Sequence, residues 1–172
     1  MSFLGGGHDN RAASGWRGGE QWTAGRGRDA WHDGRVTESF YDRVGGAPVF
    51  RALVDRFYAG VADDPPLRAM YPEEDLGPAA DRLRMFLEQY WGGPKTYGEQ
   101  RGHPRLRIRH APFAVTPTQR DRWLKHMLAA VDGLALEPDD DAELRDYLVR
   151  AAQFMVNSFD DEGPAQTSSR VL

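Results

Sequence analysis

The residues best suited to metal chemistry lie in one short stretch, residues 101–113, which reads RGHPRLRIRHAPF. It holds two of the five histidines and four arginines. Pro104 and Pro112 limit any helix between them to about two turns, because proline cannot donate a backbone N–H inside a helix. Leu106 and His110 are four residues apart and would share one helix face. The spacing therefore predicts that His110 points beside a leucine into an apolar interior.

An imidazole in such a position is either a metal ligand or a hydrogen-bonded core residue, and the spacing alone leaves both open. Nearby cations disfavour imidazolium, so Arg107 and Arg109 should keep the ring neutral and able to donate a lone pair. Arg105 and Arg109 share a second face and would form a cationic rim that suits a ligand with carboxylates. Haem is a cofactor of this kind, because one protein side chain can hold its metal and acidic groups lie at the edge of the cofactor.

Length and composition narrow the class of protein. A chain of 172 residues suits one folded domain. The absence of cysteine excludes disulfides, iron–sulfur clusters and thiolate-bound zinc or haem. A net charge of −4 gives no basic field for nucleic acid. No apolar run approaches the ~20 residues that span a bilayer, and the N-terminus lacks an apolar signal segment. These features predict a cytoplasmic protein without a membrane span.

The first 38 residues differ from the rest of the chain. They hold nine of the nineteen glycines, and five arginines are balanced by five acids. Such a composition predicts a disordered N-terminal arm. Trp16, Trp22 and Trp31 are unexpected in a linker: they could fold back onto the domain or bind a partner, or the start codon could lie too far upstream. Residues 159–172 are expected to form a flexible tail.

Residues 39–158 have a helical pattern throughout, and no strand pattern competes with it. Ser39 can cap a first short helix, and Pro48 opens a second that carries an apolar stripe. Thr116 to Gln119 form a capping box, the clearest helix start in the chain. The expected helices are 39–44, 47–62, a single turn at 67–71, about fourteen residues from Pro78, the short helix before Pro112, 117–134 and 139–155, with a loop at 95–102. The domain is predicted to be all-α.

Three inward positions in this pattern carry a polar group: Tyr58, Tyr71 and Trp123. Burying such a group without a partner costs roughly 1–3 kcal/mol, so each needs a hydrogen bond. The partner could be a nearby carbonyl in an ordinary core. Three such residues together, opposite a histidine, favour a polar cavity.

Several segments resemble the truncated haemoglobins of the second group. They are Phe57-Tyr58, the Tyr71-Pro72 turn, residues 83–94 (LRMFLEQYWGGP), residues 102–106 (GHPRL) and residues 110–113 (HAPF), with Trp123 where that group has a distal tryptophan. The similarity covers residues 39–158. It implies a globin-like two-over-two helical sandwich that encloses haem b.

The resemblance also implies roles for single residues. His110 matches the proximal iron ligand, and Tyr58, Tyr71 and Trp123 match the distal donors to a bound gas. Further matches are Leu83 and Phe86 on the pocket wall, Arg82 and Tyr97 at the haem propionates, and Ala79 where many globins keep a distal histidine or glutamine.

Two other histidines are expected to be structural or solvated. Pro104 should hold His103 in the turn before the short helix, and His126 should lie on the outer side of its helix. The arm of about 38 residues is longer than the leader usual in the group.

The implied function is tight binding of dioxygen and other diatomic gases at a penta-coordinate haem iron. Donors such as Trp123 slow the release of dioxygen, which suits a carrier poorly. The sequence therefore favours redox chemistry of oxygen, nitric oxide or peroxide, with nitric oxide dioxygenase-like or peroxidase-like activity and a reductase as partner. The alternative is a gas store or sensor whose N-terminal arm binds a partner, and either protein could be a homo-oligomer.

Overall fold

The computed structural model describes residues 38–160, and in this part of the chain it contains eight helices and no strand. The helices are α1 (Phe40–Arg43), α2 (Ala47–Ala62), α3 (Pro65–Arg68), α4 (Gly77–Tyr90), α5 (Thr96–Arg101), α6 (Leu106–His110), α7 (Pro117–Asp132) and α8 (Pro138–Met155). The predicted disordered arm, residues 1–38, and flexible tail, residues 159–172, lie outside the described part except for residue 38 and residues 159–160.

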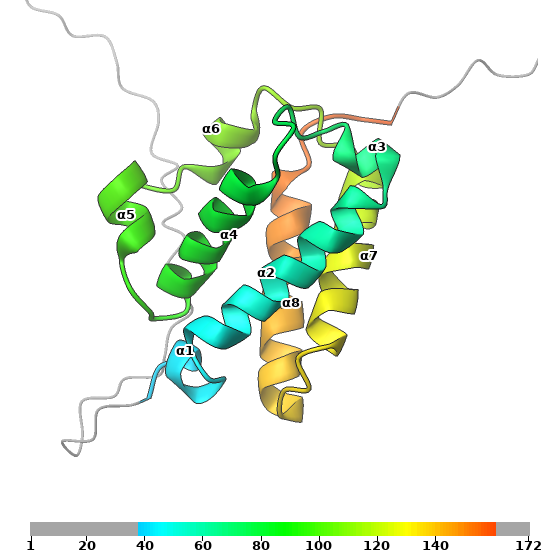
Figure 1. The fold of residues 1–172 in the computed structure, drawn as a ribbon. Coiled ribbons are helices and arrows are strands. Elements are labelled where there is room, and N and C mark those ends of the chain that lie inside the picture. The colour runs from blue at the N-terminus through cyan, green and yellow to red at the C-terminus, as the bar shows by residue number, and fades with distance from the viewer. Residues whose placement is uncertain (1–37, 161–172) are drawn as a thin grey trace, which may run out of the picture. The chain divides into compact units, whose positions relative to one another are not determined.

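Two pairs of long helices make the body of the domain (Figure 1). Helix α2 packs against α4 in one pair, α7 packs against α8 in the other, and α2 also contacts α7. The buried core lies between the pairs, because α2, α7 and α8 each turn one apolar face inward. Its fully buried side chains include Leu53, Phe57, Met127, Leu144 and Leu148. The predicted all-α, two-over-two arrangement is confirmed.

Local sequence signals set where the helices begin. The Thr116 side chain accepts a hydrogen bond from the Gln119 backbone N–H, as the capping box predicted, and α7 follows. The Ser39 hydroxyl accepts from the Asp42 N–H at the start of α1 in the same way. Helix α2 begins after Gly46, whose φ of 68° lies in the left-handed region that only glycine adopts freely.

Two expected boundaries were wrong. Residues 95–102 were expected to be a loop but contain α5. A tertiary contact explains this helix: the Gly98 N–H donates to the side-chain oxygen of Gln89 on α4 at 2.7 Å, and the buried Tyr97 ring lies 5.7 Å from that of Phe86. Helix α3 begins at Pro65, two residues before the expected turn, because the Asp64 carboxylate accepts from the Leu67 N–H and caps it.

The short helix between the two prolines is present as α6, with five residues. Arg105 precedes it with a φ of 43° and so turns the chain sharply into the helix. In residues 38–160 none of the helices has the length and apolar character needed to cross a bilayer.

Candidate functional site

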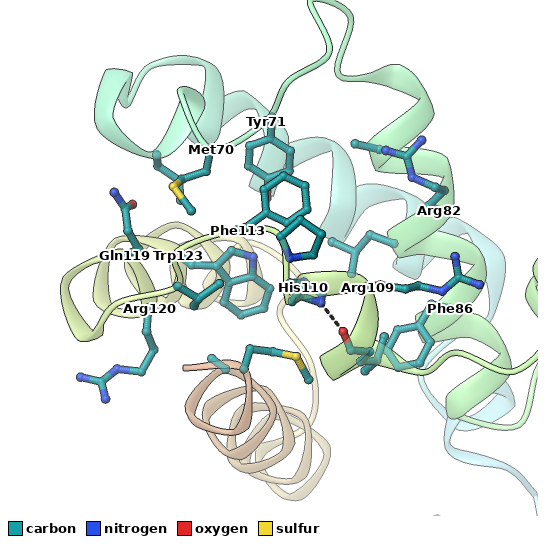
Figure 2. A pocket seen from close by; sticks show the side chains of 18 of the residues that line it. Met70, Tyr71, Arg82, Phe86, Arg109, His110, Phe113, Gln119, Arg120 and Trp123 are labelled. Atoms are coloured by element: carbon teal, nitrogen blue, oxygen red, sulfur yellow. Dashed lines mark hydrogen bonds between the residues drawn. The ribbon is translucent and has the colours of Figure 1, made fainter. Parts of the chain in front are cut away.

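A cavity of about 720 Å³ opens between α4, α6 and α7, within the size range of cofactor pockets. All nine residues that the sequence singled out for a ligand line its wall (Figure 2). They are Tyr58, Tyr71, Ala79, Arg82, Leu83, Phe86, Tyr97, His110 and Trp123. Residues from five helices and one turn therefore converge on a single space.

His110 is half-buried at the end of α6, and its ring is fixed by the helix itself. Its Nδ1 lies 2.7 Å from the backbone carbonyl oxygen of Leu106, one turn earlier (Figure 2). A neutral imidazole that donates Nδ1–H to a carbonyl has its lone pair on Nε2. Histidines that bind metals are usually oriented by such a bond. The geometry fits a single-histidine ligand for the iron of haem.

No alternative multidentate metal site competes with this one. Among the described residues, no group of three or more His, Asp or Glu side chains could hold an ion. A metal at His110 would therefore need its other ligands from a non-protein group. A porphyrin supplies them.

The three polar residues predicted to face a cavity form one hydrogen-bonded cluster. The rings of Tyr58 and Tyr71 meet edge to face, with centroids 5.6 Å apart. Burial, and then interaction with Tyr71, raises the pKa of Tyr58. Burial also raises the pKa of Tyr71, while hydrogen bonds with Tyr58 and Trp123 act in the opposite direction. Both phenols therefore stay neutral at physiological pH.

The number of protons in this cluster leaves one of them free to act elsewhere. The Trp123 N–H can only donate and interacts with the Tyr71 oxygen, and the hydroxyls of Tyr58 and Tyr71 interact with each other. The bond between the two hydroxyls uses one phenol proton, so the other is available for an acceptor inside the cavity.

Two cationic side chains of the cavity wall, Arg82 and Arg109, lie apart from Tyr71 and Trp123 in Figure 2. A third, Arg120, lies on the side of Trp123 and pairs with a carboxylate. Arg82 forms an ion pair of 2.8 Å with Glu73 and lowers the pKa of that carboxyl. Arg109 donates to the backbone carbonyls of Pro104 and Arg101, at 2.8 and 2.9 Å. The wall thus has a donor-lined part and a cationic part, joined by apolar side chains.

Sequence reasoning missed several lining residues. Met70, Arg101 and Gln119 also face the cavity. The capping box had marked Gln119 only as a helix start, yet its side-chain oxygen is buried without a hydrogen-bond partner among the described residues. No sequence signal identified Met70, because its position follows from the turn after α3.

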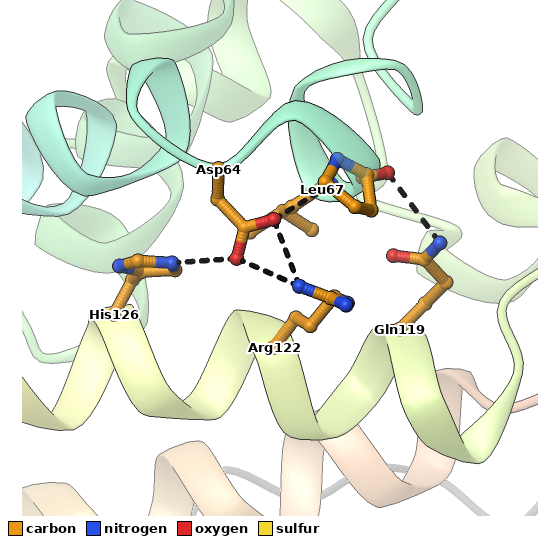
Figure 3. A network of polar contacts seen from close by, with 6 residues as sticks. Asp64, Leu67, Gln119, Arg122 and His126 are labelled. Atoms are coloured by element: carbon orange, nitrogen blue, oxygen red, sulfur yellow. Dashed lines mark hydrogen bonds and ion pairs between the residues drawn. The ribbon is translucent and has the colours of Figure 1, made fainter.

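A buried carboxylate ties the segment before Tyr71 to the helix that carries Trp123 (Figure 3). Asp64, at the start of α3, lies 3.1 Å from the Arg122 guanidinium and 2.9 Å from His126 Nε2. His126 was expected to be solvated, and this was wrong: it is largely buried and donates to Asp64. Residue 126 turns inward because α2 approaches closely at Gly60, where a Cβ atom would lie 2.5 Å from His126 Nδ1.

His103 shows the structural role expected of it. Its Nδ1 accepts a hydrogen bond of 3.3 Å from the Arg105 backbone N–H in the turn before α6.

Residues 39–157 match the family of bacterial-like globins. The chain is a bacterial-like globin. Among its relatives is a group 2 truncated haemoglobin of Bacillus subtilis, YjbI, which is 41% identical over 121 residues that cover 68% of this chain and 88% of the relative. The globin thus belongs to the truncated haemoglobins of group II, as the motifs indicated.

Solved structures agree with this assignment. A thermostable haemoglobin from the actinobacterium Thermobifida fusca is 62% identical with a TM-score of 0.69, over 70% of this chain and 98% of that one. The group II truncated haemoglobin of Bacillus anthracis is 36% identical with a TM-score of 0.71, over 75% and 98%. Membership of this family implies that the globin uses haem to bind dioxygen and related gases.

Replacing Asp64 with Asn should lower the melting temperature at neutral pH, because Arg122 and His126 lose their charged partner. The bond from His126, and then the Leu67 N–H and Arg122, hold the pKa of Asp64 below its usual value. Asp64 therefore stabilises the folded state fully above its unfolded pKa of about 3.9 and loses this effect as the pH falls through its folded pKa. The difference in melting temperature between wild type and Asp64→Asn should accordingly shrink on acidification.

The matched control is Asp63→Asn, which removes the same charge from the exposed neighbouring side chain. Thermal unfolding followed by circular dichroism between pH 3 and 7 measures both variants. Equal effects of the two substitutions at pH 7 would contradict the ion-pair explanation.

Proposed function

We propose that this globin holds haem b in the cavity, with His110 as the only protein ligand to a penta-coordinate iron. The Nδ1 bond to the Leu106 carbonyl supports this, since it leaves Nε2 free for the metal. Arg82 and Tyr97 would bind the propionates, and Leu83 and Phe86 would pack on the porphyrin. Haem held in this way supplies an iron atom with an open position for a diatomic gas.

The observation that carries the functional proposal is the cluster of Tyr58, Tyr71 and Trp123. Its hydrogen bonds link the three side chains and leave one phenol proton for a ligand. A change in tyrosine orientation would let Trp123 or Tyr58 donate as well. Ala79 has only a methyl group and cannot donate a hydrogen bond, so these three residues alone would polarise a bound gas.

The cluster favours retention of dioxygen over delivery. Each hydrogen bond to the gas adds about 0.5–1.5 kcal/mol, and two slow its release by roughly one to two orders of magnitude. We therefore propose that the globin turns dioxygen or peroxide over with nitric oxide or another small reductant. Oxidation of nitric oxide balances as NO + O₂ + e⁻ → NO₃⁻, so the proposal needs a one-electron reductase. The alternative of a sensor with a partner-binding arm depends on residues 1–38, almost all of which lie outside the described part.

Substituting His110 by Gly should abolish stable haem binding, because no other described side chain replaces the imidazole. The measurement is the Soret band of the protein purified with haem, and 10 mM imidazole should restore it by filling the vacated space. His103→Gly is the matched control from the same segment and should keep the band. An unchanged Soret band in His110→Gly without imidazole would refute the assignment of the ligand.

Substituting Trp123 by Phe should raise the rate at which dioxygen leaves the pocket by about 2- to 12-fold, which corresponds to one hydrogen bond of 0.5–1.5 kcal/mol. The ring is kept, so packing changes little. Stopped-flow displacement of dioxygen by carbon monoxide measures the rate. Tyr41→Phe removes a hydroxyl from a side chain that does not line the cavity and should leave the rate unchanged. A Trp123→Phe rate equal to wild type would argue against the donor role.

The redox proposal is tested by mixing the ferrous, oxygen-loaded globin with nitric oxide. We expect one nitrate per haem and complete conversion to the ferric protein within the mixing experiment. Nitrate is measured by ion chromatography and the ferric form by its visible spectrum. Simple exchange of dioxygen for nitric oxide, without nitrate, would favour the gas store instead.

A further inference from the structure

Four arginines lie close together in the sequence at the end of α5, just before α6 and within α6. Arg101, Arg105, Arg107 and Arg109 are all exposed. Within residues 38–160 none of the four forms an ion pair. Arg107 and Arg109 donate only to backbone carbonyls, those of Phe154, Pro104 and Arg101, which neutralise no charge.

Arginines elsewhere in the domain differ in their partners. Most of them pair with a carboxylate at 2.6–3.3 Å: Arg43, Arg82, Arg84, Arg120, Arg122, Arg145 and Arg150. The contrast follows from the sequence, since residues 100–120 contain five arginines and no acidic residue. Although the net charge of the chain is −4, the surface at α6 therefore carries a local positive field.

Apolar side chains lie among these arginines. Ile108 is 69% exposed, which is unusual for an isoleucine in a short helix. The guanidinium of Arg107 stands 5.0 Å from the centre of the Phe154 ring, which is itself 38% exposed. A hollow of about 340 Å³ adjoins them, lined by Arg107, Ile108, Ala111, Met155, Asn157 and Ser158. Exposed apolar groups ringed by arginine are typical of protein interfaces.

The same surface borders the haem cavity. Ile108 and Arg109 face solvent and also line the cavity wall, and His110 follows them in α6. A protein seated on α6 would thus lie against the wall that bears the proposed iron ligand. We define the α6 surface as Arg101, Arg105, Arg107, Ile108, Arg109 and Phe154.

We propose that the α6 surface docks a small acidic protein that carries a one-electron flavin or iron–sulfur centre. This inference rests on the proposed function, which needs one electron for each nitric oxide consumed. The reduced carrier loses one electron and the ferric globin gains it, with no atom transferred. Opposite charges steer the encounter and raise its rate. The small area suits such a partner, because electron-transfer complexes are weak and bury less than about 1,200 Å².

Other anionic partners fit this surface less well. Helix α6 has five residues, too few to lay an amphipathic face into a lipid surface. Nucleic acid would need a longer basic track than four arginines, and the negative net charge of the chain would repel it. An acidic protein that contacts a small area needs neither a long amphipathic helix nor a long basic track.

The test uses the full-length haem-loaded globin in its ferric form and an acidic flavodoxin as the probe. The double variant Arg105→Gln/Arg107→Gln removes two charges from the α6 surface without touching the cavity wall. Isothermal titration at 20 mM salt should show binding to wild type, at least tenfold weaker binding to the variant, and a loss of affinity for wild type as salt is raised to 200 mM. The rate of haem reduction by the reduced flavodoxin should fall in parallel.

The matched control is Arg51→Gln/Arg56→Gln on α2, where both arginines are exposed and Arg56, like Arg107, donates to a backbone carbonyl. It should bind flavodoxin like wild type. Equal weakening in both variants, or no measurable binding to either flavodoxin or a plant-type ferredoxin, overturns the proposal. So does preferential binding of the α6 surface to vesicles with anionic lipid, or self-association that the α6 variant abolishes.

Binding of the oxidised carrier to the ferric globin involves no gas chemistry. Nitrate formation with chemically reduced globin can therefore succeed while docking fails, or the reverse, so the two proposals fail independently.

Discussion

The close packing of α2 on α7 is the constraint on which the site depends. It requires a residue without a Cβ at position 60, because the ring of His126 occupies that space. The contact brings the ring of Phe57 to 5.2 Å from that of Trp123 and places Tyr58 beside the same cavity. Asp64 then joins the end of this packed pair to α7 through Arg122 and His126. Donors that come from three separate segments are thereby held around one cavity.

On the other side of the cavity, the short helix α6 fixes the orientation of His110. The carbonyl of Leu106 fixes the tautomer of His110, and Pro104 and Pro112 confine the helix that sets their spacing. An amphipathic helix of ordinary length would have buried this face against the core. The brevity of α6 leaves its outer face, with Ile108 and the arginines, in solvent and its inner face in the cavity wall. One short element can thus serve both a ligand and a partner.

Charge is distributed unevenly over the domain. Most arginines lie within reach of a carboxylate, often one turn away on the same helix, as with Arg84 and Glu88 or Arg145 and Asp141. Each pair of this kind adds little to the stability of the fold. Its two opposite charges cancel, however, so the pair produces little electrostatic field at a distance. The segment before Thr116 lacks acids, so its positive charge is not cancelled locally. The chain therefore has a negative net charge, while the surface beside its cavity is positively charged.

The sequence by itself determined the helices with strong caps and apolar stripes, the family, and the nine residues that meet in the cavity. These depend on local spacing or on motifs, as with Thr116 at the start of α7 or His110 four residues after Leu106. Only the tertiary structure decided α5, the inward position of His126 and the contacts among Tyr58, Tyr71 and Trp123. Each of these depends on a contact between segments far apart in the chain, such as Gln89 with Gly98 or Asp64 with His126, and periodicity within one helix carries no information about such contacts.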